Sequence, residues 1–105
     1  MSQKGYDFLG LAQRAGHLQS GDAAVEAIIK KGKAKLVIMA LDASERTKEH
    51  FKNLAKYKKV PWVEGGHKMT IGIALGKSPR SVAVVTDEGF SRNLLQLFSG
   101  DEGDF

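Results

Sequence analysis

The stretch Gly21–Leu41, GDAAVEAIIKKGKAKLVIMAL, carries a helix pattern that leads directly into a strand pattern. Between Ala24 and Ile29 the apolar residues recur at the spacing of one helix face, and Gly32 stands where that helix would end. Residues 20–22 can each cap its start. The run KLVIMAL is continuously apolar, which predicts a strand buried on both faces. This succession indicates an α/β fold.

The rest of the chain repeats this alternation. Asp42 and Ser44 are candidate caps of a long helix that carries acids in its first turn and lysines in its last, and Gly89 opens the final helix. We therefore predict a three-layer α/β/α sandwich with a central mixed sheet of about four strands. The other segments that we expect are helices over 4–15, closed by Gly16, 67–77 and 90–98, and strands over 17–20, 60–64 and 81–86.

Length and charge suggest one domain with an anionic partner. The chain has 105 residues, of which 42% are hydrophobic, and we expect a single domain over 1–100 and a flexible acidic tail over 101–105. The net charge is +4, and without the three acids of the tail it would be +4 + 3 = +7. Such a basic domain is typical of proteins that bind an anionic polymer. The alternative interpretation is that the positive charge only keeps the protein soluble. The chain has no cysteine, signal-peptide pattern or membrane-span pattern, so we expect a cytoplasmic protein.

The sequence contains no motif that indicates catalysis. His17, His50 and His67 have no metal-ligand spacing, and nucleophile-elbow and phosphate-loop motifs are absent. Asp22 and Glu26 are one helical turn apart, but no acid or base partner is visible nearby in the sequence. We predict no catalytic residue, no metal, no cofactor and no small-molecule substrate.

Basic residues form three groups along the chain. The first surrounds the Gly32 turn, and the second is expected to form an exposed stripe on the helix after Ser44. The third is GKSPR, where two cations, a hydroxyl and a rigid proline bend can grip phosphates. The lysines of the first two groups are, in order, Lys30, Lys31, Lys33 and Lys35, then Lys48, Lys52, Lys56 and Lys59.

The segments GDAAVEAIIKKGKAKLVIMALDAS, VPWVE, IGIALGK and SVAVVTDEGF together resemble the kink-turn-binding ribosomal protein superfamily. LGLAQRAG near the start and VTDEGF near the end are similar to its small bacterial YlxQ-like branch. The resemblance implies binding of structured RNA, ribosomal or regulatory, possible ribosome association and a monomer. It implies that a helix N-terminus enters a bent internal loop at tandem sheared G·A pairs, while the loop before the last central strand covers a flipped-out nucleotide.

Carried over to this chain, the first contact falls on 20–24 and the second on 77–81. Distorted RNA loops expose base edges, and their crowded phosphates attract cations. With the acidic and basic neighbours that can complete the contact, the predicted RNA-binding residues are Arg14, Ser20, Gly21, Asp22, Ala23, Ala24, Glu26, Lys30, Lys33, Arg46, Lys77, Ser78, Pro79, Arg80 and Ser81.

The chain departs from the usual Gly-x-Asn-Glu-x-x-Lys of the kink-turn binders, because it has Ala23, Ala24 and Ala27 at the amide, carboxylate and lysine positions. Asp22 or Glu26 can accept hydrogen bonds from guanine edges instead, and Lys30 or Arg14 can supply the cation. Two alternatives stay open. One is a protein-interaction module that kept the fold and lost the RNA grip. The other is an enzyme or a detached substrate-binding domain resembling those attached to RNA methyltransferases.

Overall fold

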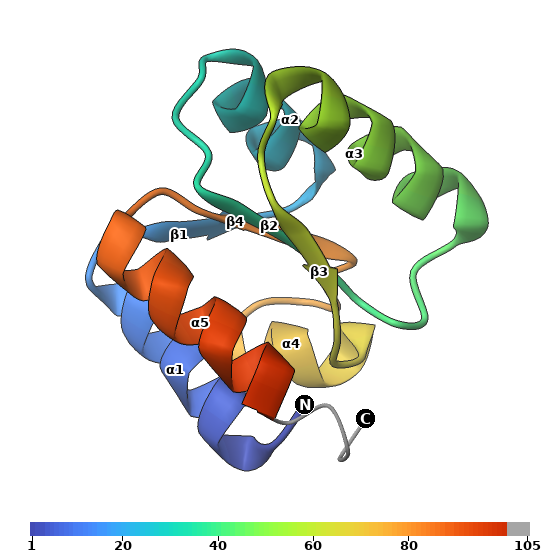
Figure 1. The fold of residues 1–105 in the computed structure, drawn as a ribbon. Coiled ribbons are helices and arrows are strands. Elements are labelled where there is room, and N and C mark those ends of the chain that lie inside the picture. The colour runs from blue at the N-terminus through green and yellow to red at the C-terminus, as the bar shows by residue number, and fades with distance from the viewer. Residues whose placement is uncertain (101–105) are drawn as a thin grey trace.

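The computed structural model describes residues 1–100, in which five helices surround a four-stranded sheet (Figure 1). The predicted α/β class and three-layer arrangement are confirmed. The predicted acidic tail over 101–105 lies outside the described residues. In chain order the elements are α1 (Gln3–Arg14), β1 (Leu18–Ser20), α2 (Asp22–Lys30), β2 (Leu36–Met39), α3 (Glu45–Lys58), β3 (Trp62–Glu64), α4 (Lys68–Leu75), β4 (Val82–Val85) and α5 (Glu88–Gly100).

The sheet has the strand order β1-β4-β2-β3 and is mixed, as predicted. Strand β4 lies between β1 and β2 and is antiparallel to both, whereas β2 and β3 are parallel. In this register Met39 at the end of β2 pairs with Val82 at the start of β4, and Leu36 pairs with Val85. The loops before and after β4 therefore lie at opposite ends of the sheet.

Both faces of the sheet are covered, which explains the continuously apolar strands. Leu36 and Ile38 of β2 face the layer of α1, α4 and α5, whereas Val37 and Met39 face the layer of α2 and α3. All four side chains are at least 99% buried. Figure 1 shows the two layers, with the blue α1 and red α5 on one side and α2 and α3 on the other. The alternation of neighbouring residues between two cores fixes the strand register.

Two details of the helix ends differ from the sequence expectation, and one agrees with it. Ser44 alone caps α3, through a hydrogen bond of 3.1 Å from the Thr47 N–H to its Oγ. Asp42 instead accepts a 2.9 Å hydrogen bond from the Lys68 N–H at the start of α4, a partner far away in the chain. Helix α5 begins at Glu88, one residue before Gly89, and the Asp87 carboxylate caps it.

The expected exposed lysine stripe on α3 is wrong in its first half, at Lys48 and Lys52. Glu64 of β3 binds Lys52 at 2.8 Å and Lys48 at 3.2 Å, so the two lysines hold α3 against the neighbouring strand instead of facing water freely. The Lys48 side chain retains only 14% of its exposure. Over the part of the chain that the structure describes, no helix is both long and apolar enough to cross a membrane.

Candidate nucleic-acid interface

The first half of the predicted interface is the turn between β1 and α2. Gly21 occupies the N-cap position of α2 with φ 99° and ψ 147°, a backbone region that is essentially restricted to glycine. Its N–H donates to the Val82 carbonyl at 3.1 Å, which ties the turn to the start of β4. A Cβ placed on Gly21 would meet nothing within 4 Å, so open space lies in front of this turn. A ligand can approach the backbone closely here.

No side chain of the described residues caps the first turn of α2, in contrast to the other helices. Serine hydroxyls cap α1 and α3, and the carboxylates of Asp42 and Asp87 cap α4 and α5. The first N–H groups of α2 therefore face outward without a capping side chain, where a hydrogen-bond acceptor can use them. Asp22, the exposed first residue of the helix, places its negative charge beside these donors.

The second half is the loop from Lys77 to Ser81, between α4 and β4. Its backbone is anchored at both ends: the Lys77 N–H donates to the Gly72 carbonyl at 2.8 Å, and the Ser81 carbonyl accepts from the Ala40 N–H at 2.9 Å. Gly72 also packs directly under the loop, because a Cβ at this position would collide with the Ser78 carbonyl group. Glycine within a helix usually only weakens it, whereas Gly72 acts as a spacer below the loop.

Arg80 joins the two halves. Its Nε donates to Ser20 Oγ at 3.0 Å and its Nη1 donates to Ser78 Oγ at 3.0 Å, so one guanidinium bridges the turn and the loop. A cavity of about 300 Å³ opens beside this bridge. Its lining residues are Gln13, Gly16, Leu18, Gln19, Ser20, Lys77 and Arg80.

The structure thus brings together the two segments that the sequence analysis assigned to RNA binding. It also adds Gln13 and Gln19, which line the same cavity and whose place no sequence motif indicated. The predicted residues of the two segments are accessible to different degrees. Asp22, Ala23, Lys77, Ser78 and Pro79 are exposed, and Ser20, Gly21, Ala24, Arg80 and Ser81 are half-buried.

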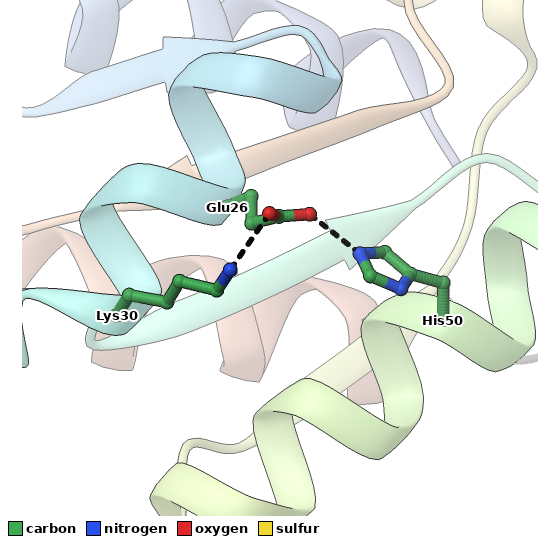
Figure 2. A network of polar contacts seen from close by, with 3 residues as sticks. All are labelled: Glu26, Lys30 and His50. Atoms are coloured by element: carbon green, nitrogen blue, oxygen red, sulfur yellow. Dashed lines mark hydrogen bonds and ion pairs between the residues drawn. The ribbon is translucent and has the colours of Figure 1, made fainter.

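Glu26 and Lys30 lie on α2 away from this turn and bind each other. Figure 2 shows the Glu26 carboxylate between Lys30 Nζ at 2.9 Å and His50 Nε2 of α3 at 2.7 Å. The hydrogen bond from Lys30 and then that from His50 lower the pKa of Glu26 below its ordinary value. The carboxylate has an acid–base neighbour that the sequence did not reveal, and its two oxygens are already engaged. Its predicted role in reading guanine would require these contacts to be exchanged.

Three further predicted residues lie outside the cavity. Arg14 lines a separate hollow of about 240 Å³ between α1 and α4. Arg46 is exposed in the first turn of α3, which follows the end of β2. Lys33 lies in the α2–β2 loop, which leads into the start of β2 and therefore belongs to the opposite end of the sheet. Within residues 1–100, no group of three potential metal ligands converges.

Comparison with known proteins places the chain among relatives of this architecture. Residues 3–95 match the ribosomal protein L7Ae/L30e/S12e/Gadd45 family. The RNA-binding protein YlxQ of Enterococcus faecium is 40% identical over 93% of this chain and 94% of its own length. The protein of the same name from Bacillus subtilis is 37% identical over 88% of this chain and 92% of its own. A solved structure from Bacillus halodurans, described as of unknown function, has a TM-score of 0.88 and 35% identity, covering 93% of this chain and 99% of that one.

Proposed function

Because the chain belongs to the ribosomal protein L7Ae/L30e/S12e/Gadd45 family, we propose that it binds structured RNA through the turn before α2 and the loop before β4. The resemblance stated from the sequence, including its YlxQ-like branch, is confirmed by this membership. RNA-binding proteins of this family are not catalysts, and the prediction that the chain is not an enzyme is likewise confirmed.

The proposed target is a kink-turn or a related bent internal loop of ribosomal or regulatory RNA in the cytoplasm, bound by a monomer that can associate with the ribosome. The observation that carries this proposal is the Arg80 bridge, which holds an uncapped helix start and a cationic loop as one surface. A bent loop presents base edges and crowded phosphates together, so it can use both the N–H groups of α2 and the charges of Lys77 and Arg80.

Asp22 determines the orientation of the RNA in this proposal. Its carboxylate repels phosphates but accepts hydrogen bonds from the N–H groups of a guanine edge. The exposed Ala23 beside it has no polar side-chain atom, so it adds no base-reading group of its own. We therefore infer that Asp22 faces bases, while the phosphates lie on the side of Lys77 and Arg80.

The proposal is tested by titrating a kink-turn RNA and a straight duplex of the same composition into the protein, with binding followed by gel shift. We expect a preference for the kinked RNA, and we expect Arg80→Ala to remove most of it because the bridge and a phosphate contact are lost together. Lys4→Ala, which removes an exposed charge from the other end of α1, should leave the preference intact. Equal affinity of the unmodified protein for both RNAs would refute the kink-turn assignment.

The two exposed alanines of α2, Ala23 and Ala27, favour a second candidate, a protein-interaction module of the same fold. After Asp22, they leave apolar side chains where the kink-turn binders carry polar ones. Affinity capture with and without nuclease separates the candidates. A protein partner that stays bound after RNA is digested, together with no preference for kinked RNA, would favour this second function.

A further inference from the structure

The end of the sheet opposite to the proposed interface carries a dense group of cations. Five of them, Lys33, Lys35, Lys58, Lys59 and Arg92, come from three separate parts of the chain, and we call them the far basic surface. They lie on the α2–β2 loop, at the end of α3 and on α5. The start of β2 pairs with the end of β4, so these segments meet at the edge away from Ser20 and Arg80.

The far basic surface surrounds a hollow. Lys35, Lys58, Lys59 and Arg92 line a cavity of about 330 Å³, and Lys33 lies between two other lining residues, Gly32 and Ala34. Among the residues that the structure describes, Glu88 is the only acid in the lining, and it pairs with Lys35 at 4.0 Å. Asp87 is nearby in the chain, but its carboxylate caps α5.

Ion pairing distinguishes these cations from the other lysines of α3. Lys48 and Lys52 are neutralised by Glu64, whereas Lys33, Lys58, Lys59 and Arg92 form no ion pair with any residue that the structure describes. Exposed lysines near a helix end often serve only the helix dipole. That explanation covers Lys58 and also Lys33, which follows the end of α2, but it does not cover Arg92, which lies near the start of α5.

Lys59 gives an independent indication. Its φ is 58°, and every other described residue with a positive φ is a glycine. The left-handed conformation strains a residue that has a Cβ, so glycine would be the more stable choice at this helix end. A lysine is present there in spite of the strain, which points to a use for its charge.

The distribution of charge between the two ends strengthens this indication. At the proposed interface, Lys77 and Arg80 are offset by Asp22, which leaves 2 − 1 = +1, whereas the five cations of the far basic surface are offset by Glu88, which leaves 5 − 1 = +4. Salt-dependent RNA affinity grows with the number of phosphates that cations neutralise. Most of the capacity for such contacts therefore lies away from the interface that would read the RNA.

We propose that the far basic surface binds the phosphate backbone of a second RNA segment without regard to its sequence, so that one protein molecule holds two RNA segments at opposite ends of its sheet. This inference rests on the proposed function, since RNA is taken as the ligand of the protein. Lys48 and Lys52, which bind Glu64, keep a structural role in this proposal. The second RNA segment is recognised only through the charge of its phosphates.

The proposal is tested first by fluorescence anisotropy with a labelled straight RNA duplex, over a series of salt concentrations. We expect the double variant K33E/R92E to bind about tenfold more weakly near 100 mM salt and to show a shallower salt dependence. The matched variant K4E reverses one exposed charge outside both surfaces and should lose about twofold or less. Equal losses in K33E/R92E and K4E, after correction for the number of charges reversed, would overturn the proposal.

A second arm tests whether the two segments are held together. Protein is captured on an immobilised kink-turn RNA, and the labelled straight duplex is then added. Wild type should retain the duplex, whereas K33E/R92E should remain on the kink-turn RNA without retaining it. Retention by K33E/R92E at the wild-type level would refute a second RNA site. Binding of polyglutamate, but not of the duplex, to the far basic surface would also refute it and would assign an acidic protein as the ligand instead.

The two proposals can fail separately. If kinked and straight RNA bind equally well, the proposed function fails, yet the anisotropy comparison of K33E/R92E with K4E still decides whether the far basic surface binds RNA. If the kinked RNA is preferred and the comparison shows no difference, only the second site is refuted.

Discussion

Lys59 shows how one residue can separate stability from function. Because its φ is 58°, we expect Lys59→Gly to stabilise the fold by about 0.5–1 kcal/mol, the relief of left-handed strain less the added freedom of glycine in the unfolded chain. Urea denaturation measures this change. The same variant should bind straight duplex RNA more weakly, because it removes a cation of the far basic surface.

The neighbouring residue is the matched control for this prediction. Lys58 ends α3 in an ordinary helical conformation, so Lys58→Gly removes the same charge but should destabilise the fold by about 0.5 kcal/mol. A destabilised Lys59→Gly would show that the lysine side chain makes a contact worth more than the strain.

For single residues, the sequence predicted backbone conformations better than hydrogen-bond partners. Gly16 and Gly32 end their helices in the left-handed region, and Ser44 caps α3, as local rules require. The partner of Asp42 was not predictable, because the Lys68 N–H comes from a helix 26 residues later. The same holds for Glu26, whose contact with His50 forms only when α2 and α3 pack against the same face of the sheet.

Among the helices, α4 depends on a glycine for its fit. Replacing an exposed helical glycine by alanine usually stabilises the protein. Gly72→Ala should do the opposite and destabilise by about 1–3 kcal/mol, because the new Cβ would lie 2.8 Å from the Ser78 carbonyl carbon and 3.0 Å from the Lys77 carbonyl oxygen. Thermal unfolding measures the loss. We also expect weaker binding of kinked RNA, since the displaced loop contains both Lys77 and Arg80.

Met69→Ala on the same helix supplies the comparison. Met69 is 66% exposed, and its truncation should change stability little. A stabilising effect of Gly72→Ala would show that the loop moves away freely and that Gly72 does not position it.

The contact between α3 and β3 should depend on pH through Glu64. Its hydrogen bond with Lys52, followed by that with Lys48, lowers its pKa below the ordinary value of 4.5. Because the pKa of Glu64 is lower in the folded protein than in the unfolded chain, its stabilising effect is fully present above the ordinary value of 4.5. The effect is lost as the pH falls through the lower folded-state pKa. We expect Glu64→Gln to cost about 0.5–1 kcal/mol at neutral pH and to unfold like wild type in strong acid.

Urea midpoints at neutral and acid pH check this expectation. Glu26 and Asp42 also have lowered pKa values, so wild type loses part of its stability in the same direction, and only the difference between wild type and Glu64→Gln isolates Glu64. Glu49→Gln, on the exposed side of α3, serves as control. A deficit of Glu64→Gln that persists unchanged in acid would assign the effect to packing instead of charge.

The element types and their order were predictable because each strand or helix carries its own periodicity. The exposed lysine stripe failed for a related reason: periodicity gives the face of a helix, but not which neighbouring strand borders that face. Glu64 lies at the end of a three-residue strand, and nothing in the sequence of α3 indicates that this carboxylate reaches it.

For the whole molecule, the acidic tail should modulate association with RNA. Deleting residues 101–105 raises the net charge from +4 to +4 + 3 = +7. We expect duplex affinity to rise about two- to threefold near 50 mM salt and to be unchanged near 500 mM, where screening is nearly complete. Anisotropy titrations at both concentrations measure this. An increase that persists at high salt would indicate that the tail competes by direct contact.

The candidate interface was half predictable. The segments around Gly21 and Lys77 followed from the family resemblance, and the structure places them side by side. The bridge between them could not be derived, since Arg80 and Ser20 are 60 residues apart and meet only because β4 lies next to β1. The far basic surface was hidden for the same reason, as its cations come from three loops and helices that share one end of the sheet.

The position of β4 affects how the protein can fold during its synthesis. This strand is the last of the four to be synthesised, yet it lies between β1 and β2, which do not pair with each other. A nascent chain that ends before Val82 therefore lacks the strand that joins β1 to the rest of the sheet, and Arg80 has no fixed path to Ser20. RNA capture at the proposed interface should begin only after β4 has left the ribosome, and a fragment of residues 1–80 should show no cooperative unfolding and no preference for kinked RNA.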